Sequence, residues 1–153
     1  MSLEGKKAPS FTLEGSDGKQ HSLSDYKGKM MVIYFYPKDN TPGCTKEACG
    51  FRDLSKELSD LGVVVLGVSK DSIAAHNKFI TNYTLPFVLL SDPDFSMMKD
   101  YEAFGEKVMC GKKSFGTIRS TVIVGADGIV KKQWEKIAKA EQHPDLVLAY
   151  LRG

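Results

Sequence analysis

The stretch Met30–Ser69, MMVIYFYPKDNTPGCTKEACGFRDLSKELSDLGVVVLGVS, contains two apolar runs with a segment of helical spacing between them. The first run, Met30–Tyr36, is apolar throughout, as is typical of a strand covered on both faces, and Pro37 ends it. The second run, Val63–Ser69, predicts another buried strand. The stretch therefore predicts a strand, a helix and a second strand in succession, with the first strand at the centre of a sheet.

The segment between the two runs predicts a helix from about Cys44 to Leu61, with Gly62 just beyond its end. Its apolar side chains recur at helical spacing, and we expect them on one buried face: Phe51, Leu54, Leu58 and Leu61. Pro42 precedes this helix and therefore does not disturb it.

The rest of the chain continues the alternation of strands and helices. Hairpins are expected at Phe11–Leu23, turning at Ser16–Gly18, and at Ser120–Trp134, turning at Ala126–Gly128. One further strand and three helices are expected at Phe87–Asp92, Ile73–Tyr83, Asp94–Gly105 and Pro144–Arg152. The pattern predicts an α/β fold with a central mixed β-sheet flanked by helices and an N-terminal β-hairpin, which is the element order of the thioredoxin-like fold.

The composition is that of one globular domain, and we expect a single domain over residues 1–153. Hydrophobic residues make up 42% of the chain, and 21 Lys and Arg stand against 19 Asp and Glu, a formal net charge of +2. That balance argues against binding to nucleic acid or to an anionic membrane surface. No stretch approaches the roughly 20 apolar residues of a membrane span, and the N-terminus shows no signal peptide, so we expect a cytoplasmic protein without a membrane partner.

Three cysteines are too few for a disulfide scaffold, which again indicates a reducing compartment. Cys44 stands at the start of the expected helix, where unpaired backbone N–H groups and the positive end of the helix dipole favour a thiolate. The preceding segment, Asn40–Gly43, supplies a hydroxyl, a rigid turn and a glycine that lets the backbone approach a small ligand. The position alone leaves two interpretations open, a reactive thiol or a small buried hydrophobic side chain.

Cys49 follows Cys44 by five residues in the same expected helix. Five residues of α-helix give about 7.5 Å of rise and roughly 140° of net rotation. The two Cα atoms then lie beyond the roughly 7 Å limit for a disulfide, so the two thiols can be joined only if the start of the helix unwinds. The spacing does not support a zinc site, and it differs from the Cys-x-x-Cys of dithiol-exchange proteins. His21, His76 and His143 occur singly, as ordinary surface or core histidines do.

At these residues the chain resembles a known family. The segment PKDNTPGCT fits the Pro-x-x-x-Thr-x-x-Cys signature of peroxiredoxins, and CTKEAC is similar to the Q-type subfamily, which includes the bacterioferritin comigratory proteins. The similarity extends along the chain through KAPSFTL, GVVVLGVSKDS and LPFVLLSD. It continues into EKVMCGKKSFGTIRSTVIVGADG, which carries an arginine, Arg119, at the family's position. Four residues match the family's site: Pro37, Thr41, Cys44 and Arg119.

The resemblance implies a thiol peroxidase in which Cys44 is the peroxidatic thiolate that attacks one oxygen of a hydroperoxide. Thr41 would hydrogen-bond the thiolate and the peroxide, and the backbone N–H groups near Gly43 and Cys44 would hold the oxygens. Arg119 would favour the thiolate and stabilise charge on the leaving oxygen.

Two further residues enter through the same resemblance. Pro37 would shield the pocket from water. Glu47 matches an acid of the family and would orient Arg119. Without the resemblance, Arg119 could be a surface charge on a strand, and Thr41 a plain helix cap.

The attack would leave Cys44 as a sulfenic acid, which condenses readily with a neighbouring thiol. Cys49 would be that resolving thiol, after local unwinding of the helix start. A thioredoxin-like dithiol reductant would then complete the cycle, and no metal, flavin, haem or other cofactor is expected, because the sulfur carries the redox chemistry. We expect a monomer and leave a dimer open.

Cys110 has no place in this mechanism, and we interpret it as incidental. Two other functions on the same fold stay open. A thiol–disulfide oxidoreductase would need two cysteines already within bonding reach and would not need Thr41 and Arg119. A non-enzymatic redox sensor or binding protein would use the same oxidation once, without turnover.

Overall fold

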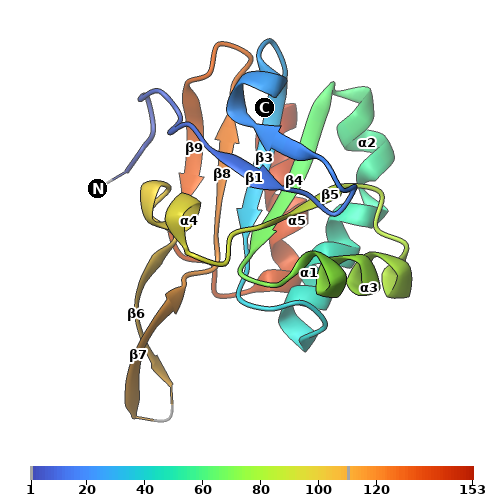
Figure 1. Cartoon of the computed structure of the whole chain (residues 1–153). Coiled ribbons are helices and arrows are strands. Elements are labelled where there is room, and N and C mark those ends of the chain that lie inside the picture. The colour runs from blue at the N-terminus through green and yellow to red at the C-terminus, as the bar shows by residue number, and fades with distance from the viewer. Residues whose placement is uncertain (1, 110) are drawn as a thin grey trace.

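The computed structural model describes residues 2–109 and 111–153, and Figure 1 shows a central sheet with helices against both of its faces. The five-stranded sheet has the order β5-β4-β3-β8-β9. Its strands are β3 (Met30–Phe35), β4 (Val63–Ser69), β5 (Val88–Ser91), β8 (Ser120–Val124) and β9 (Val130–Trp134). β3 pairs parallel with β4 and antiparallel with β8, so the sheet is mixed, and the predicted thioredoxin-like α/β fold is confirmed.

In the described residues, five α-helices, two hairpins and two short 3-10 turns surround this sheet. The helices are α1 (Pro42–Asp53), α2 (Ser55–Asp60), α3 (Ile73–Tyr83), α4 (Ser96–Asp100) and α5 (His143–Arg152), with 3-10 turns at Leu23–Tyr26 and Ala140–Gln142. The N-terminal hairpin is β1 (Thr12–Glu14) with β2 (Gln20–Ser22), as predicted. A second hairpin is formed by β6 (Phe104–Met109) and β7 (Lys112–Thr117). None of the helices in the described residues is long and apolar enough to span a membrane.

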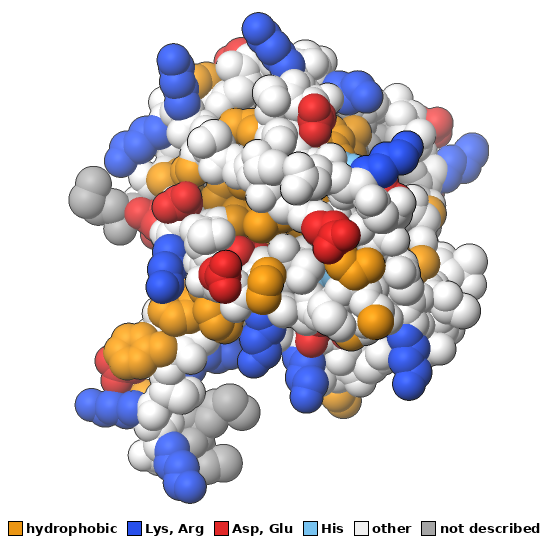
Figure 2. Space-filling view, viewed as in Figure 1, with side chains coloured by type: hydrophobic (Ala, Val, Ile, Leu, Met, Phe, Trp, Pro, Cys, Tyr) orange, Lys and Arg blue, Asp and Glu red, His pale blue; other side chains and the backbone are white. Residues whose placement is uncertain are grey.

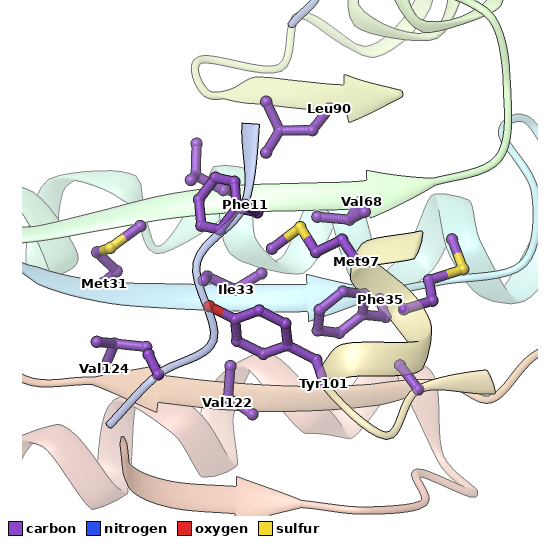
Figure 3. Packing of buried hydrophobic residues seen from close by; sticks show 14 of the residues in the cluster. Phe11, Met31, Ile33, Phe35, Val68, Leu90, Met97, Tyr101, Val122 and Val124 are labelled. Atoms are coloured by element: carbon purple, nitrogen blue, oxygen red, sulfur yellow. The ribbon is translucent and has the colours of Figure 1, made fainter. Parts of the chain in front are cut away.

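Alternate side chains of β3 enter two separate cores. Met31, Ile33 and Phe35 pack with α4 and the segment around Phe11 on one face, as Figure 3 shows. Val32 and Tyr34 point to the opposite face, where they pack with α1, α3 and α5. Because both faces of β3 are buried, the continuous apolar run of the sequence is explained.

The predicted helix over Cys44–Leu61 was wrong in three respects. The helix begins at Pro42, which occupies its first turn without a lost hydrogen bond because N–H groups there have no helical partner. It also breaks at Leu54, whose φ of −98° and ψ of 8° are not helical, so α2 starts in a new direction. As a result Leu58 is buried while Leu61, predicted to be in the core, is 44% exposed.

The predicted helix over Asp94–Gly105 was also too long. The helix α4 ends at Asp100, and Glu102 takes a left-handed φ of 62°. The Ala103 N–H closes the helix end on the Met98 carbonyl, and Phe104 then pairs with Thr117 as the first residue of β6. Pairing with the following strand, β7, therefore overrides the helical pattern at Phe104 and Gly105.

The β6–β7 hairpin was not predicted. It projects from the body of the molecule in Figure 1, and Figure 2 shows apolar side chains exposed on this arm. Val108 and Phe115 are among the most exposed large hydrophobic residues of the described chain. Cys110 lies outside the described residues, so our interpretation of it stays a prediction.

A substitution at Gly67 in β4 tests how tightly the sheet packs against α1. A Cβ at Gly67 would lie 2.7 Å from Leu89 Cδ2 and 2.9 Å from Tyr34 Cζ, and the Tyr34 ring stacks on Phe51 of α1. We predict that Gly67→Ala lowers the free energy of unfolding by about 1–3 kcal/mol, because both buried neighbours must shift.

Gly116→Ala is the matched control, because the nearest atom to its Cβ is the flexible Lys107 Cδ at 3.8 Å. This variant should change the free energy of unfolding by no more than about 0.5 kcal/mol. Urea unfolding of both variants measures the difference, and equal stabilities would contradict this account of the packing.

Candidate active site

The loop between β3 and α1 places Cys44 in the first turn of the helix. Asn40 adopts a left-handed φ of 61°, and Thr41 is extended as the N-cap residue. The first helical bond runs from the Thr45 N–H to the Thr41 carbonyl over 2.8 Å. Cys44 is therefore the third residue of α1, beside unpaired backbone N–H groups, and its side chain is 1% exposed.

Arg119 reaches Cys44 from a remote part of the chain. It stands in the two-residue link between β7 and β8, and its carbonyl accepts from the Ile137 N–H. Its Nη2 lies 3.2 Å from Cys44 Sγ, and its Nη1 donates to Glu47 Oε1 over 2.7 Å. The side chain is 17% exposed, so Arg119 is not a surface charge on a strand.

Gly43 explains how the guanidinium comes so close to the start of the helix. A Cβ at this position would lie 3.3 Å from Arg119 Nη2. That separation is tighter than most real Cβ contacts, so a larger residue would push the guanidinium away from the sulfur. The glycine thus makes room for a protein side chain, a reason that the sequence alone did not supply.

Glu47 is buried one helical turn beyond Cys44 and shares the same guanidinium. Burial raises its pKa to about 7, although the charge and hydrogen bond of Arg119 act in the opposite direction. Burial also disfavours the charge of Arg119, but Glu47 and Cys44 more than offset this and raise its pKa. One cation therefore serves two acids, and the buried Glu47 Oε2 has no hydrogen-bond partner among the described residues.

Thr41 lies next to this cluster, but its hydrogen is already used. The hydroxyl donates to the Lys38 carbonyl over 2.8 Å rather than to the Cys44 sulfur. The lone pairs of the hydroxyl oxygen are left to accept a hydrogen bond from a ligand. In this structure the Thr41 hydroxyl is therefore free to accept from a peroxide O–H group, and its expected hydrogen bond to the thiolate stays a prediction.

A pocket of about 470 Å³ opens beside Arg119. It is lined by residues of the loop after β3, the β6–β7 hairpin and the segment after β9: Pro37, Glu106, Lys107, Val108, Ile118, Arg119, Lys136 and Ile137. Burial and the neighbouring charge of Arg119 lower the pKa of Lys107. The pocket combines apolar walls with a positive electrostatic field next to the sulfur.

Cys49 lies in α1 beyond the first turn, where it is half-buried with a free thiol. Both Cys44 and Cys49 are within the intact helix, which places their Cα atoms about 7.5 Å apart along its axis. The two thiols thus cannot be bonded in this conformation. In the described part of the chain, no three His, Cys, Asp or Glu side chains are grouped as metal ligands would be.

Sequence reasoning missed a buried polar cluster directly beneath the loop. Asp39, His76 and Tyr36 are all buried, and the Asp39 carboxylate is bonded to both of the other side chains. His76 had been interpreted as an ordinary surface or core residue, and it is indeed in the core. A polar residue in a loop gives no pattern from which its burial could be predicted.

The sequence of this chain is similar to those of known proteins over most of its length. Residues 4–133 match the model of the AhpC/TSA family. A Coxiella burnetii protein whose name assigns it to peroxiredoxin bcp is 51% identical, with 94% of this chain and 95% of that one covered. Peroxiredoxin Bcp of Bacillus subtilis is 44% identical, with 94% and 91% covered.

A solved structure gives the corresponding comparison in three dimensions. It is of the Xanthomonas campestris bacterioferritin comigratory protein and is described in terms of that protein's alkyl peroxide reduction activity. The two chains are 39% identical with a TM-score of 0.87, and the match covers 93% of this chain and 90% of the other.

The buried acid Glu47 makes the stability of the protein depend on pH. The unfolded chain loses the Glu47 proton near the ordinary pKa of 4.5, whereas the folded chain keeps it until about 7. The folded state therefore binds more protons in this window, and the Glu47 contribution to stability falls as the pH rises from about 4.5 to about 7. We predict that Glu47→Gln removes this contribution, which is on the order of a few kcal/mol.

The measurement is the difference in free energy of unfolding between wild type and Glu47→Gln across pH 4–8. His143, whose pKa is lowered to about 4 by burial and by Arg119, acts in the opposite direction, but it is present in both proteins and cancels. Glu135→Gln, at an exposed position, is the control and should give a flat difference. A flat difference for Glu47→Gln as well would contradict the burial account.

Proposed function

Because the chain belongs to the AhpC/TSA family and, within it, to the peroxiredoxins of the Bcp and Q type, we propose that it reduces hydrogen peroxide and organic hydroperoxides by a two-cysteine mechanism. Cys44 is the peroxidatic thiol, Cys49 the resolving thiol, and a thioredoxin-like dithiol the reductant. The observation that carries this proposal is the Arg119 guanidinium, which contacts Cys44 Sγ at 3.2 Å across 75 residues of sequence.

In the first step the Cys44 thiolate attacks one oxygen of the hydroperoxide. A sulfur–oxygen bond forms, the oxygen–oxygen bond breaks, and its electron pair leaves on the second oxygen, which takes up a proton as water or an alcohol. The Cys44 sulfur is oxidised to sulfenic acid. Arg119 and the N–H groups of the first turn lie where negative charge moves from sulfur to oxygen, so they stabilise the transition state without reorganisation.

Thr41 and Pro37 fit supporting roles in the same step. The Thr41 hydroxyl donates to Lys38, so its free lone pairs accept the O–H of the bound peroxide and orient it. Pro37 is half-buried beside Arg119 and lines the adjacent pocket, where it limits access of water. That pocket has space for the organic group of a larger hydroperoxide, in keeping with the alkyl peroxide activity by which the Xanthomonas campestris protein is described.

In the second step the Cys49 thiol attacks the Cys44 sulfenic acid. A disulfide forms and water leaves, so the two sulfurs together have given two electrons to the peroxide. The helix must first unwind at its start, because the intact α1 keeps the two sulfurs apart. The dithiol reductant then reduces the disulfide by thiol exchange, and α1 re-forms. A plain thiol–disulfide oxidoreductase is not favoured, because its two cysteines would already lie within bonding reach.

The two cysteines should differ in their variants. Cys44→Ser should abolish peroxide consumption, whereas Cys49→Ser should consume one equivalent and then stop when thioredoxin is the reductant. Peroxide consumption, counted against free thiols and followed by peptide mapping, makes the distinction. In wild type, one equivalent of hydrogen peroxide should remove two thiols and yield a Cys44–Cys49 link; undiminished consumption by Cys44→Ser would overturn the assignment.

Arg119 should govern the first step alone. Arg119→Ala should slow single-turnover peroxide consumption on the order of 100-fold or more, because the charge that stabilises both thiolate and leaving oxygen is lost. Arg152→Ala, which removes an exposed arginine at the end of α5, is the control and should react at the wild-type rate. An unchanged rate for Arg119→Ala would reduce the contact with Cys44 to a structural one.

A further inference from the structure

The loop that carries the active site rests on a buried polar cluster. Asp39, 6% exposed, accepts from the Tyr36 hydroxyl on Oδ1 at 2.5 Å and is bonded through Oδ2 to His76 Nδ1 at 2.7 Å. Its backbone N–H donates to Asp71 Oδ2 at 2.8 Å. Asp39 is thus tied to the end of β3, to α3 and to the turn after β4.

The hydrogen bonds of His76 define the charge of this cluster. Its Nε2 lies 2.9 Å from the Leu90 carbonyl, which can only accept, so Nε2 carries a hydrogen. One further hydrogen lies between Nδ1 and Asp39 Oδ2. Whichever of the two atoms holds it, His76 and Asp39 together are neutral, and both are satisfied without water. Such a fully bonded buried cluster is costly to disturb.

The rest of the loop is held much less firmly. The Thr41 side chain bonds within the loop, to the Lys38 carbonyl, and does not cap α1. Asn40 is in the left-handed region and accepts from Asn82 over a long 3.4 Å, in an exposed position. Tyr36 continues β3 by bonding the Val68 carbonyl, and among residues 37–41 Asp39 is the buried residue that fixes the loop to the body of the protein.

We propose that Asp39 is a positioning residue: through Tyr36 and His76 it holds the Thr41–Cys44 turn in the peroxide-reactive conformation and thereby sets how often the start of α1 unwinds. The inference rests on the proposed function in that unwinding leads to the Cys44–Cys49 bond. Asp39 touches neither sulfur in the structure, so it acts through the loop and not on the reacting atoms.

The consequence is that two reactions compete for the Cys44 sulfenic acid. In the folded conformation, a second hydroperoxide molecule can oxidise Cys44 from sulfenic to sulfinic acid, with release of water or an alcohol. In the unwound conformation, Cys49 condenses with the sulfenic acid and water leaves. A firm Asp39 anchor favours the first outcome, and a broken one favours the second.

Asp39→Ala breaks the anchor, and Asp39→Asn preserves it. In the Asn variant, the amide oxygen accepts from Tyr36, and the amide nitrogen donates to a neutral His76 that still bonds Leu90 through Nε2–H. We expect Asp39→Ala to raise about tenfold the peroxide concentration that gives half-maximal sulfinic acid, whereas Asp39→Asn stays near wild type.

A second readout does not require peroxidase activity. Cys44 is 1% exposed, so a thiol reagent too bulky for the pocket beside Arg119, such as a dye-linked maleimide, reaches it in the reduced protein only after the start of α1 opens. Asp39→Ala should speed Cys44 alkylation about tenfold, while the half-buried Cys49 serves as the internal reference. Peptide mapping separates the two sites.

The chain offers a matched control with the same three residue types. In the N-terminal hairpin, His21 bonds Asp17 through Nε2 at 2.9 Å and Tyr26 through Nδ1 at 2.7 Å. Asp17→Ala should leave Cys44 alkylation and sulfinic acid formation unchanged. A second pair of variants makes a smaller change. Tyr36→Phe removes one hydrogen bond to Asp39 and should shift Cys44 alkylation and sulfinic acid formation in the same direction as Asp39→Ala, but by less. Tyr26→Phe is its control and should shift neither.

If Asp39→Ala alkylates at the wild-type rate, or if Asp17→Ala accelerates alkylation equally, the positioning role is overturned. If Asp39→Asn behaves as Asp39→Ala, the hydrogen-bond account is overturned. Failure of the proposed function is distinguished from failure of this inference by the wild-type protein. If the proposed function is wrong, wild type consumes no peroxide, and the Cys44 alkylation rates still decide the role of Asp39. Should Asp39→Ala not fold, Tyr36→Phe against Tyr26→Phe decides the same question.

Discussion

The guanidinium of Arg119 is shared by the Cys44 sulfur and the Glu47 carboxylate, and the rest of the site is arranged around that shared charge. Because Glu47 lies almost one helical turn after Cys44, both groups face Arg119 from the same side of α1. Gly43 leaves room for the guanidinium, and the link between β7 and β8 delivers it. This half-buried cation contacts both acids only if helix, link and sheet keep their relative position.

The same helix imposes the opposite requirement on the second cysteine. An intact α1 holds Cys44 against Arg119 and keeps Cys49 beyond disulfide distance of Cys44. In the proposed mechanism, the conformation that reacts with peroxide is therefore the one that excludes the disulfide. The broken join at Leu54 separates α1 from α2, so the start of α1 can change without carrying α2 with it. In the proposed mechanism, the buried bond of Asp39 to His76 opposes unwinding of α1, and a helix start that no side chain caps favours it.

Most of the fold could be predicted because its strands, helices and turns follow from apolar spacing and turn residues that lie close together in the sequence. The apolar run of β3, the helix over Ile73–Tyr83 and the turn between β8 and β9 are local signals, and each was confirmed. The break at Leu54 was missed because the apolar spacing continues through it to Leu58, and the β6–β7 hairpin was missed because its mostly polar strands lack the alternation of a half-buried strand. The contact of Arg119 with Cys44 joins segments 75 residues apart, so only the family resemblance placed Arg119 at the site. No pattern in the sequence predicts the hydrogen bond between Asp39 and His76.

The central claim is that α1 must unwind before Cys49 can bond to Cys44. Amide hydrogen exchange along α1 tests it most directly, measured in the reduced protein and again after one equivalent of hydrogen peroxide. The account predicts that amides of residues 45–49 are protected in the reduced protein and lose protection on oxidation. Those of β3 should stay protected throughout, because both faces of that strand remain buried. A Cys44–Cys49 disulfide formed with the α1 amides still protected would contradict the claim that the helix must unwind.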